Sequence, residues 1–271
     1  MLKTKKSERI AAVTKILVDN PNVLFNLDYF SEKFNAAKST LSEDILTIKE
    51  TFERFGLGEI TTIPGAGGGI KYKPKWGNEP TKDFLIDICS KLKDPKRIIP
   101  GGFIYMTDII LSPALVSRIG EIFADRFSHK NPDYIVTVET KGITLAIMTA
   151  RAMNIPLVII RRNVKVTEGP SVSINYLSGS SQRIQTMSLP RRAIKEDTKI
   201  LFIDDFMKAG GTAKGMIDLM SEFNAEVVGI GVMVATRDPV NKLVDDFFSL
   251  LTLNSVDTQT GKIDIIPNVN F

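Results

Sequence analysis

The 271-residue sequence contains one cysteine and one histidine, and this scarcity excludes several classes of site. Cys89 cannot form a disulfide within the chain, and its apolar helical surroundings are typical of a small core residue. His129 lies in a polar turn at 128–131, so there is no cysteine–histidine metal site and no imidazole base for a serine nucleophile. We therefore expect no protein-held metal and a reducing compartment, the cytoplasm.

Long apolar runs and a strong excess of one charge are also missing. No apolar run approaches the roughly 18 residues of a membrane span, and no leader peptide pattern is present, so we expect no membrane partner. The 35 Lys and Arg against 31 Asp and Glu give a net charge of +4, which permits nucleic-acid binding without indicating it. The length suggests about two globular domains.

What the sequence does have is one dense motif, KILFIDDFMKAGGT, at residues 199–212. Four apolar residues at 200–203 predict a short buried strand of a parallel sheet, with Asp204 and Asp205 following at its carboxyl end. A loop closing on Ala-Gly-Gly-Thr follows, and a helix is predicted over 213–223. Ligands of open α/β sheets bind outside the carboxyl ends of the strands, so the motif predicts a ligand site.

The residue types of this motif indicate a sugar phosphate. Glycines let backbone N–H groups turn around an anion, and the helix N-terminus adds partial positive charge. Asp204 and Asp205 can accept hydrogen bonds from sugar hydroxyls or hold Mg²⁺. The alternative is an ordinary strand–turn–helix in which Asp205 caps the helix and the glycines only turn the chain.

The motif resembles the signature of type I phosphoribosyltransferases, which bind phosphoribosyl pyrophosphate (PRPP). The resemblance implies that the two aspartates contact the ribose hydroxyls, with Mg²⁺ as an optional companion, and that residues 208–212 wrap the 5′-phosphate. It also implies that Thr140-Lys141-Gly142, after an earlier predicted strand, contacts pyrophosphate. The residues assigned to PRPP are Asp204, Asp205, Phe206, Met207, Lys208, Ala209, Gly210, Gly211, Thr212, Thr140, Lys141 and Gly142.

The first seventy residues have a different pattern. Apolar residues at helical spacing predict helices over 7–20, 27–34 and 39–55, with Asn26 capping the second and Gly56 ending the third. Two strand-like segments, 59–63 and 70–73, flank a glycine-rich tip. Three short helices followed by a β-hairpin predict a winged helix.

In a winged helix the third helix enters the major groove of DNA with its N-terminal residues foremost. The candidate DNA-binding residues are Lys38, Ser39, Thr40, Ser42 and Glu43 on this helix, with Lys71 and Lys73 on the wing. The alternative is a winged helix that serves only dimerisation or protein binding. Charge does not decide between them, because residues 1–74 hold eleven Lys and Arg against nine Asp and Glu.

A proline-flanked stretch at 74–80 predicts a domain boundary, which gives domains 1–74 and 75–271. Predicted strands at 103–106, 134–138, 156–160, 200–203 and 227–234 alternate with helices, one of them opened by Ser112 and Pro113. This alternation predicts a doubly wound parallel α/β sheet.

A long polar segment separates the third of these strands from the fourth. Segments 172–176 and 183–188 predict an antiparallel hairpin, where phosphoribosyltransferases have a hood that closes over pyrophosphate. The candidates for that contact are Arg162, Lys165 and Arg183, and the aromatic residues that could stack a base are Phe103, Tyr105 and Phe206.

The blocks at 166–176, 178–188 and 203–212, joined to a winged helix, resemble the purine operon regulators (PurR) of Gram-positive bacteria. The resemblance implies a homodimer that binds double-stranded DNA of purine gene control regions and senses PRPP. It also implies that guanosine alarmones compete for the PRPP site. The alternative function is an active purine phosphoribosyltransferase with an N-terminal nucleic-acid-binding domain.

Overall fold

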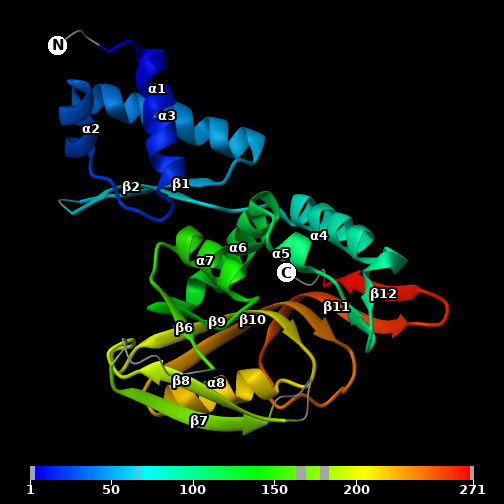
Figure 1. Ribbon diagram of the computed structural model, residues 1–271. Coiled ribbons are helices and arrows are strands. Elements are labelled where there is room, and N and C mark those ends of the chain that lie inside the picture. Colours follow the sequence, from blue (N-terminus) through cyan, green and yellow to red (C-terminus); the bar gives the residue numbers. More distant parts are fainter. Residues whose placement is uncertain (1–3, 66, 163–168, 178–182, 269–271) are drawn as a thin grey trace. The chain divides into compact units, whose positions relative to one another are not determined.

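The computed structural model describes residues 4–65, 67–162, 169–177 and 183–268 (Figure 1). It divides into two compact units, Met1–Gly77 with Arg151–Asn154, and Asn78–Ala150 with Ile155–Phe271. The boundary after residue 74 stays a prediction. No helix in the described part of the chain is long and apolar enough to cross a membrane.

The first unit has the elements expected of a winged helix. Its helices are α1 (Lys6–Asp19), α2 (Leu27–Phe34) and α3 (Lys38–Phe55), followed by the antiparallel strands β1 (Glu59–Ile63) and β2 (Gly69–Lys73). The Asn26 side chain accepts a hydrogen bond from the Tyr29 N–H and so caps α2. Asn35 and Gly56, both in the left-handed region, end α2 and α3.

The core of this unit is formed by one face of each element. Leu41, Ile45, Ile48 and Phe52 recur at helical spacing along α3, and all four are buried. They pack with buried residues of the other helices and the wing, namely Val13, Leu17, Phe30, Ile60, Ile70 and Tyr72. The opposite, polar side of α3 therefore faces away from the core.

The second unit contains a six-stranded, mostly parallel sheet. The strand order is β12 (Lys262–Pro267), β11 (Phe248–Asp257), β10 (Glu226–Thr236), β9 (Lys199–Met207), β5 (Tyr134–Val138) and β6 (Leu157–Ile160). All pairs are parallel except β11 with β12. The doubly wound α/β class is confirmed, with an antiparallel edge that the sequence analysis missed.

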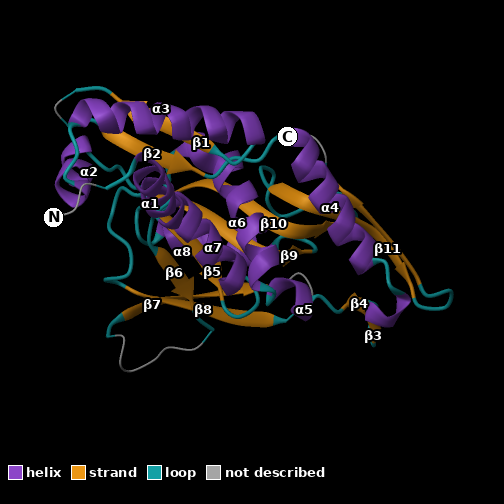
Figure 2. Ribbon diagram, turned by 90° about the horizontal axis from the view of Figure 1, so that it is seen from above, coloured by secondary structure: helices purple, strands orange, loops and turns teal. Residues whose placement is uncertain are grey.

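Helices and a hairpin cover the two faces of this sheet. Figure 1 shows α6 (Pro113–Phe127) and α7 (Ile143–Met153) on one face, with α8 (Gly211–Ser221) and the hairpin of β7 (Ser171–Leu177) and β8 (Ile184–Pro190) on the other. Figure 2 shows α4 (Asn78–Leu92) beside β11, against which it packs. The predicted hairpin is therefore confirmed.

The predicted strand at 103–106 is wrong in extent and in placement. Only β4 (Phe103–Ile104) is extended, and it pairs with β3 (Ile98–Ile99) outside the six-stranded sheet. Gly101 and Gly102, both at positive φ, close a local turn between them, and α5 (Thr107–Ile110) begins soon afterwards. Ser112 does occupy the N-cap of α6, but its side chain makes no capping hydrogen bond.

The central motif also differs from its prediction, because β9 does not end before the acid pair. Its pairing with β5 stops at Val136–Phe202, whereas its pairing with β10 continues to Ala235–Met207. Asp204 and Asp205 therefore lie within a strand, beyond the point where β5 leaves it. Helix α8 begins at Gly211 rather than residue 213, so the last residues of the motif form its first turn.

Candidate functional site

A small cavity lies where β9 gives way to α8. Its volume is about 60 Å³. Gly210 is in the left-handed region at the N-cap of α8, and no side chain caps this helix end. The first N–H groups of α8 are thus available to an anion. The cavity is lined by Phe202, Asp204, Phe206, Met207, Lys208, Ala209, Gly210, Gly211, Thr212, Ala213 and Val232.

Asp204 brings a carboxyl group to the wall of this cavity, although only 9% of the residue is exposed. Burial raises the pKa of this carboxyl well above its ordinary value, and the charge of Asp205 raises it further. One Asp204 oxygen accepts a hydrogen bond from the Asp205 N–H at 2.9 Å. The aspartate does not point into a sealed core but lines a cavity, as a ligand-binding acid must.

Asp205 is half-buried and does not line the cavity. Burial raises the pKa of its carboxyl, while a hydrogen bond from the Asp204 side chain and the charge of Lys141 lower it. The hydrogen bond between the two side chains raises the pKa of Asp204 and lowers that of Asp205, so the two carboxyl groups titrate as a pair.

The loop after β5 meets the acid pair. A Cβ placed on Gly142 would lie 2.6 Å from Asp204 Oδ1 and 2.5 Å from Thr137 Oγ1, so only glycine fits there without movement. Lys141 is exposed next to it, and its charge acts on Asp205. The structure thus brings Lys141 and Gly142 to the acid pair, whereas Thr140 is exposed on the same loop, and their contact with pyrophosphate stays a prediction.

Two further residues of this region were missed by the sequence analysis. The Tyr176 side chain on β7 packs on Gly215 of α8, and burial raises its pKa, against a lowering by the charge of Arg162 and a hydrogen bond with the Thr212 side chain. Thr137 on β5 is fully buried, and its hydroxyl has no hydrogen-bond partner in the described part of the chain. Tyr176 ends the block at 166–176 and Thr137 lies in a predicted strand, but neither pattern indicates a contact with this site.

The other residues predicted to contact pyrophosphate or to stack a base differ in their surroundings. Arg162 is exposed, and its charge lowers the pKa of both Asp204 and Tyr176. Arg183 is exposed, and nothing in the described structure links it to the acid pair. Phe103 and Tyr105 are 49% and 45% exposed, away from the core positions typical of aromatic residues. Lys165 lies outside the described residues.

The donors of this site fit a sugar phosphate. Backbone N–H groups and Lys208 suit a phosphate, and carboxylates suit sugar hydroxyls. Among the described residues, no group of three or more His, Cys, Asp or Glu side chains could hold a metal ion. A Mg²⁺ ion at the acid pair would therefore need oxygen ligands from the bound sugar phosphate itself.

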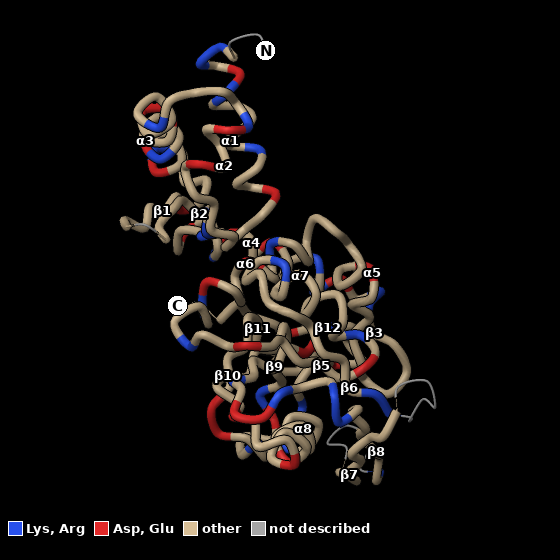
Figure 3. Tube along the Cα trace, turned by 90° about the vertical axis from the view of Figure 1, so that its left-hand side faces the viewer, with Lys and Arg blue, Asp and Glu red and all other residues tan. Residues whose placement is uncertain are grey.

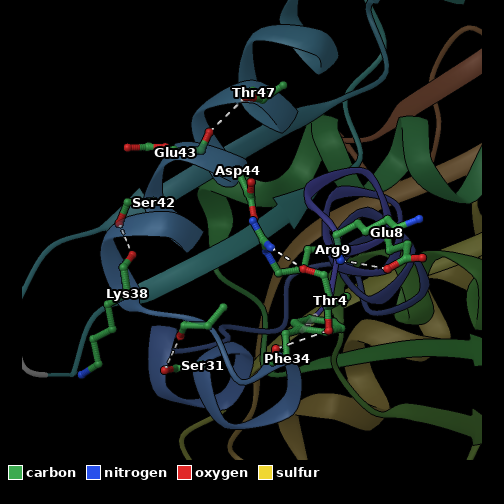
Figure 4. A network of polar contacts seen from close by, with 12 residues as sticks. Thr4, Glu8, Arg9, Ser31, Phe34, Lys38, Ser42, Glu43, Asp44 and Thr47 are labelled. Atoms are coloured by element: carbon green, nitrogen blue, oxygen red, sulfur yellow. Dashed lines mark hydrogen bonds and ion pairs between the residues drawn. The ribbon is translucent and has the colours of Figure 1, made fainter. Parts of the chain in front are cut away.

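The second candidate site is the N-terminal end of α3. Ser39, Ser42 and Glu43 are exposed there and Thr40 is half-buried. The Ser42 hydroxyl donates to the Lys38 carbonyl at 2.9 Å, and Lys38 Nζ lies 2.5 Å from Asp28 Oδ1. Figure 4 shows Glu43 and Asp44 pointing to opposite sides of α3, the first outward and the second toward Arg9.

Two of the predicted DNA-binding residues, Lys71 and Lys73, lie on the wing. Lys71 and Lys73 are half-buried on β2, where they alternate with the buried Ile70 and Tyr72. Lys73 is paired in register with Glu59 of β1. Figure 3 shows Lys and Arg interspersed with Asp and Glu along α1 and α3. The unit therefore presents individual cations rather than one continuous basic patch.

A buried ion pair holds α3 from behind. Arg9 Nε of α1 lies 2.8 Å from Asp44 Oδ2, and the two side chains are 8% and 1% exposed. Arg9 also donates to the Thr4 carbonyl at 2.7 Å (Figure 4). The second oxygen of Asp44 has no hydrogen-bond partner in the part of the chain that the structure describes. This pair fixes α3 relative to α1 and thereby positions its exposed face.

Comparisons with known proteins identify both parts of the chain. Residues 5–74 match the model of the bacterial purine repressor N-terminal domain, and residues 106–264 match that of the phosphoribosyl transferase domain. The adenine phosphoribosyltransferase of Thermoanaerobacter pseudethanolicus superposes with a TM-score of 0.54 at 19% identity, over 62% of this chain and 99% of that one. This likeness shows the type I phosphoribosyltransferase fold.

Relatives along the whole chain are more specific. The purine biosynthesis transcriptional repressor PurR of Bacillus subtilis is 47% identical over 270 residues, which cover 100% of this chain and 94% of that protein. The purine biosynthesis transcriptional activator PurR of Lactococcus lactis subsp. lactis is 37% identical over 261 residues, 96% of each chain. This chain belongs to the PurR family of bacterial purine biosynthesis transcriptional regulators.

Proposed function

We propose that the protein regulates transcription of purine biosynthesis genes by binding their control DNA through α3 and the wing, in response to PRPP bound at β9 and α8. The observation that carries the effector assignment is the cavity itself, where Asp204 and the uncapped N-terminus of α8 meet. Acid and phosphate-binding groups side by side suit a phosphorylated sugar better than any other common ligand.

Each group of residues at this site would contact a different part of PRPP. The loop residues 208–212 would hold the 5′-phosphate with their N–H groups. Asp204 and Asp205 would accept hydrogen bonds from the ribose hydroxyls, and Lys141 beside Gly142 would contact the pyrophosphate. Guanosine alarmones carry ribose and pyrophosphate, so they would compete for the same groups. The protein would act as a homodimer in the bacterial cytoplasm, where the chromosomal DNA lies.

We further propose that the site binds PRPP without transferring its phosphoribosyl group. The full-length relatives named as transcriptional regulators support this assignment. Incubation with PRPP and each purine base, followed by measurement of pyrophosphate release, tests it. We expect no release above the rate without protein, and steady turnover with any base would identify the protein as an active purine phosphoribosyltransferase instead.

The regulatory proposal is tested by DNA binding at equilibrium. Fluorescence anisotropy of the full-length protein would compare a duplex from a purine control region with a scrambled duplex, with and without PRPP. We expect tighter binding to the control-region duplex and a change of that affinity by PRPP. The Asp204→Ala/Asp205→Ala variant should bind DNA normally but lose the response to PRPP.

The matched control is Asp218→Ala, which removes an exposed carboxylate of α8 that pairs with Lys214 at 2.8 Å. This variant should respond to PRPP as the wild type does. A normal PRPP response in the double variant would show that the acid pair is not the receptor.

A further inference from the structure

A groove separates the start of α3 from the wing within the first unit. Its volume is about 590 Å³, and the helical side contributes Asn26, Asp28, Lys38 and Ser42 while the wing contributes residues 62–65 and 68–70. Only two of the residues that line the groove are charged, Asp28 and Lys38, and they form an ion pair with each other. With the pair closed, the groove has no net charge.

The position of the groove indicates its occupant. In a winged helix bound to DNA, α3 would lie in the major groove and the wing beside the minor groove, so one sugar-phosphate strand must pass between them. The groove lies between these same two elements. A phosphate passing through it would meet the Lys38 ammonium group and, at the same place, the Asp28 carboxylate.

The exposure of this pair allows it to exchange partners. The Lys38 and Asp28 side chains are 57% and 59% exposed, so water screens their attraction and the pair is weak. A DNA phosphate can therefore replace Asp28 as the partner of Lys38. Asp28 would then face the phosphate as an unpaired like charge, which opposes binding.

We propose that Asp28 restrains DNA binding by competing with a backbone phosphate for Lys38 in this groove, an inference that rests on the proposed DNA-binding function of α3. Asp28 lowers affinity for every DNA sequence alike, because phosphate contacts carry no sequence information. Weak binding to ordinary DNA leaves the contacts of α3 with bases to decide where the protein stays bound.

The test compares Asp28→Asn with Asp19→Asn in the full-length protein. Asp19 also forms an exposed ion pair, 2.7 Å from Lys15 on α1, so its substitution makes the same change of net charge away from the groove. Anisotropy titrations with the control-region and scrambled duplexes are repeated at several salt concentrations. Lys38→Met and the Asp28→Asn/Lys38→Met double variant complete a cycle.

We expect Asp28→Asn to tighten binding to both duplexes by roughly threefold to tenfold at low salt, with a steeper salt dependence. Asp19→Asn should change affinity much less, and the gain from Asp28→Asn should disappear in the Lys38→Met background. Equal effects of the two asparagine variants, or a gain that persists without Lys38, would overturn the proposal. If neither the wild type nor Asp28→Asn binds either duplex, both the proposed DNA-binding function and the proposed role of Asp28 are refuted. If the wild type binds DNA and Asp28→Asn binds it equally well, only the proposed role of Asp28 is refuted.

Discussion

The two candidate sites carry their charges in opposite ways. At the effector site, Asp204 is 9% exposed and its pKa is raised by burial. At the DNA-binding face, the side chains of Lys38 and Asp28 are more than half exposed and pair with each other. Buried charges interact strongly and tolerate little change, whereas exposed charges act weakly, additively and in a salt-dependent manner. We propose that the first site is a selective receptor and the second an adjustable surface.

The first unit also contains one exception to this contrast. Arg9 and Asp44 are as buried as Asp204, although they lie on the core side of α3, opposite its exposed face. The buried Arg9–Asp44 pair holds α3 in place, while the exposed residues of α3 can still exchange partners. The first unit therefore combines a buried ion pair with exposed charged residues.

The largest effect is expected from breaking this buried support. Asp44→Ala leaves the Arg9 guanidinium buried without its partner, so we expect the first unit to lose about 3–5 kcal/mol of unfolding free energy. Urea denaturation monitored by circular dichroism measures it. The control, Asp19→Ala, breaks an exposed pair and should cost at most about 1 kcal/mol. Equal losses in the two variants would show that burial of the Arg9–Asp44 pair has no energetic consequence.

The next largest effect is expected on PRPP affinity, without a change in DNA affinity. Gly142→Ala places a methyl group against Asp204 and Thr137, so we expect PRPP affinity to fall roughly tenfold to a hundredfold, with DNA affinity retained. Isothermal titration calorimetry with PRPP measures the change. Gly67→Ala is the control, because its Cβ would have no atom within 4 Å. Unchanged PRPP binding by Gly142→Ala would place the pyrophosphate loop elsewhere.

A smaller effect is expected at the wing. Lys71→Ala removes one half-buried cation of β2, and we expect DNA affinity to fall by about 1 kcal/mol on the control-region and scrambled duplexes alike. The slope of log affinity against log salt should decrease by about one. Lys15→Ala on α1 provides the comparison. A loss confined to the control-region duplex would instead indicate that Lys71 reads bases.

The smallest effect is a change in pH dependence. Burial raises the folded-state pKa of Asp204, so the folded protein holds a proton that the unfolded chain releases. The stability from this group is present below the ordinary carboxyl pKa and is lost as pH rises through the folded pKa. Asp204→Asn removes this titration, so its unfolding free energy should fall less than that of the wild type as the pH rises above the ordinary carboxyl pKa. Denaturant titrations at several pH values measure this difference. Parallel curves of unfolding free energy against pH for the two proteins would contradict a raised pKa of Asp204.

Local sequence patterns predicted the helices of the first unit well. The Asn26 side chain caps the start of α2 and the left-handed backbone of Asn35 ends it, which are both local properties of asparagine. The apolar stripe of α3 likewise depends only on its own spacing. The parts that failed depend on distant partners. Strand β9 continues through Asp204 because β10 remains beside it, and no feature of residues 199–212 reveals that. Phe103 has strand character, yet it pairs locally with Ile99.

The candidate sites show the same division. The loop, the acid pair and Gly142 follow from motifs, and the structure brings them together. The contact of Tyr176 with α8 requires the hairpin to fold onto that helix, and the Arg9–Asp44 pair joins residues 35 positions apart. Asp28 is an ordinary surface acid in the sequence, and only the fold places it 2.5 Å from Lys38.

We infer that the effector site and the DNA-binding face are energetically coupled. Thermodynamic linkage requires each ligand to change the affinity of the other by the same factor. Calorimetric titration of PRPP into the full-length protein, free and saturated with a control-region duplex, measures that factor directly. We predict two different PRPP dissociation constants, whose ratio equals the change in DNA affinity caused by PRPP. Identical dissociation constants with and without DNA would contradict the account.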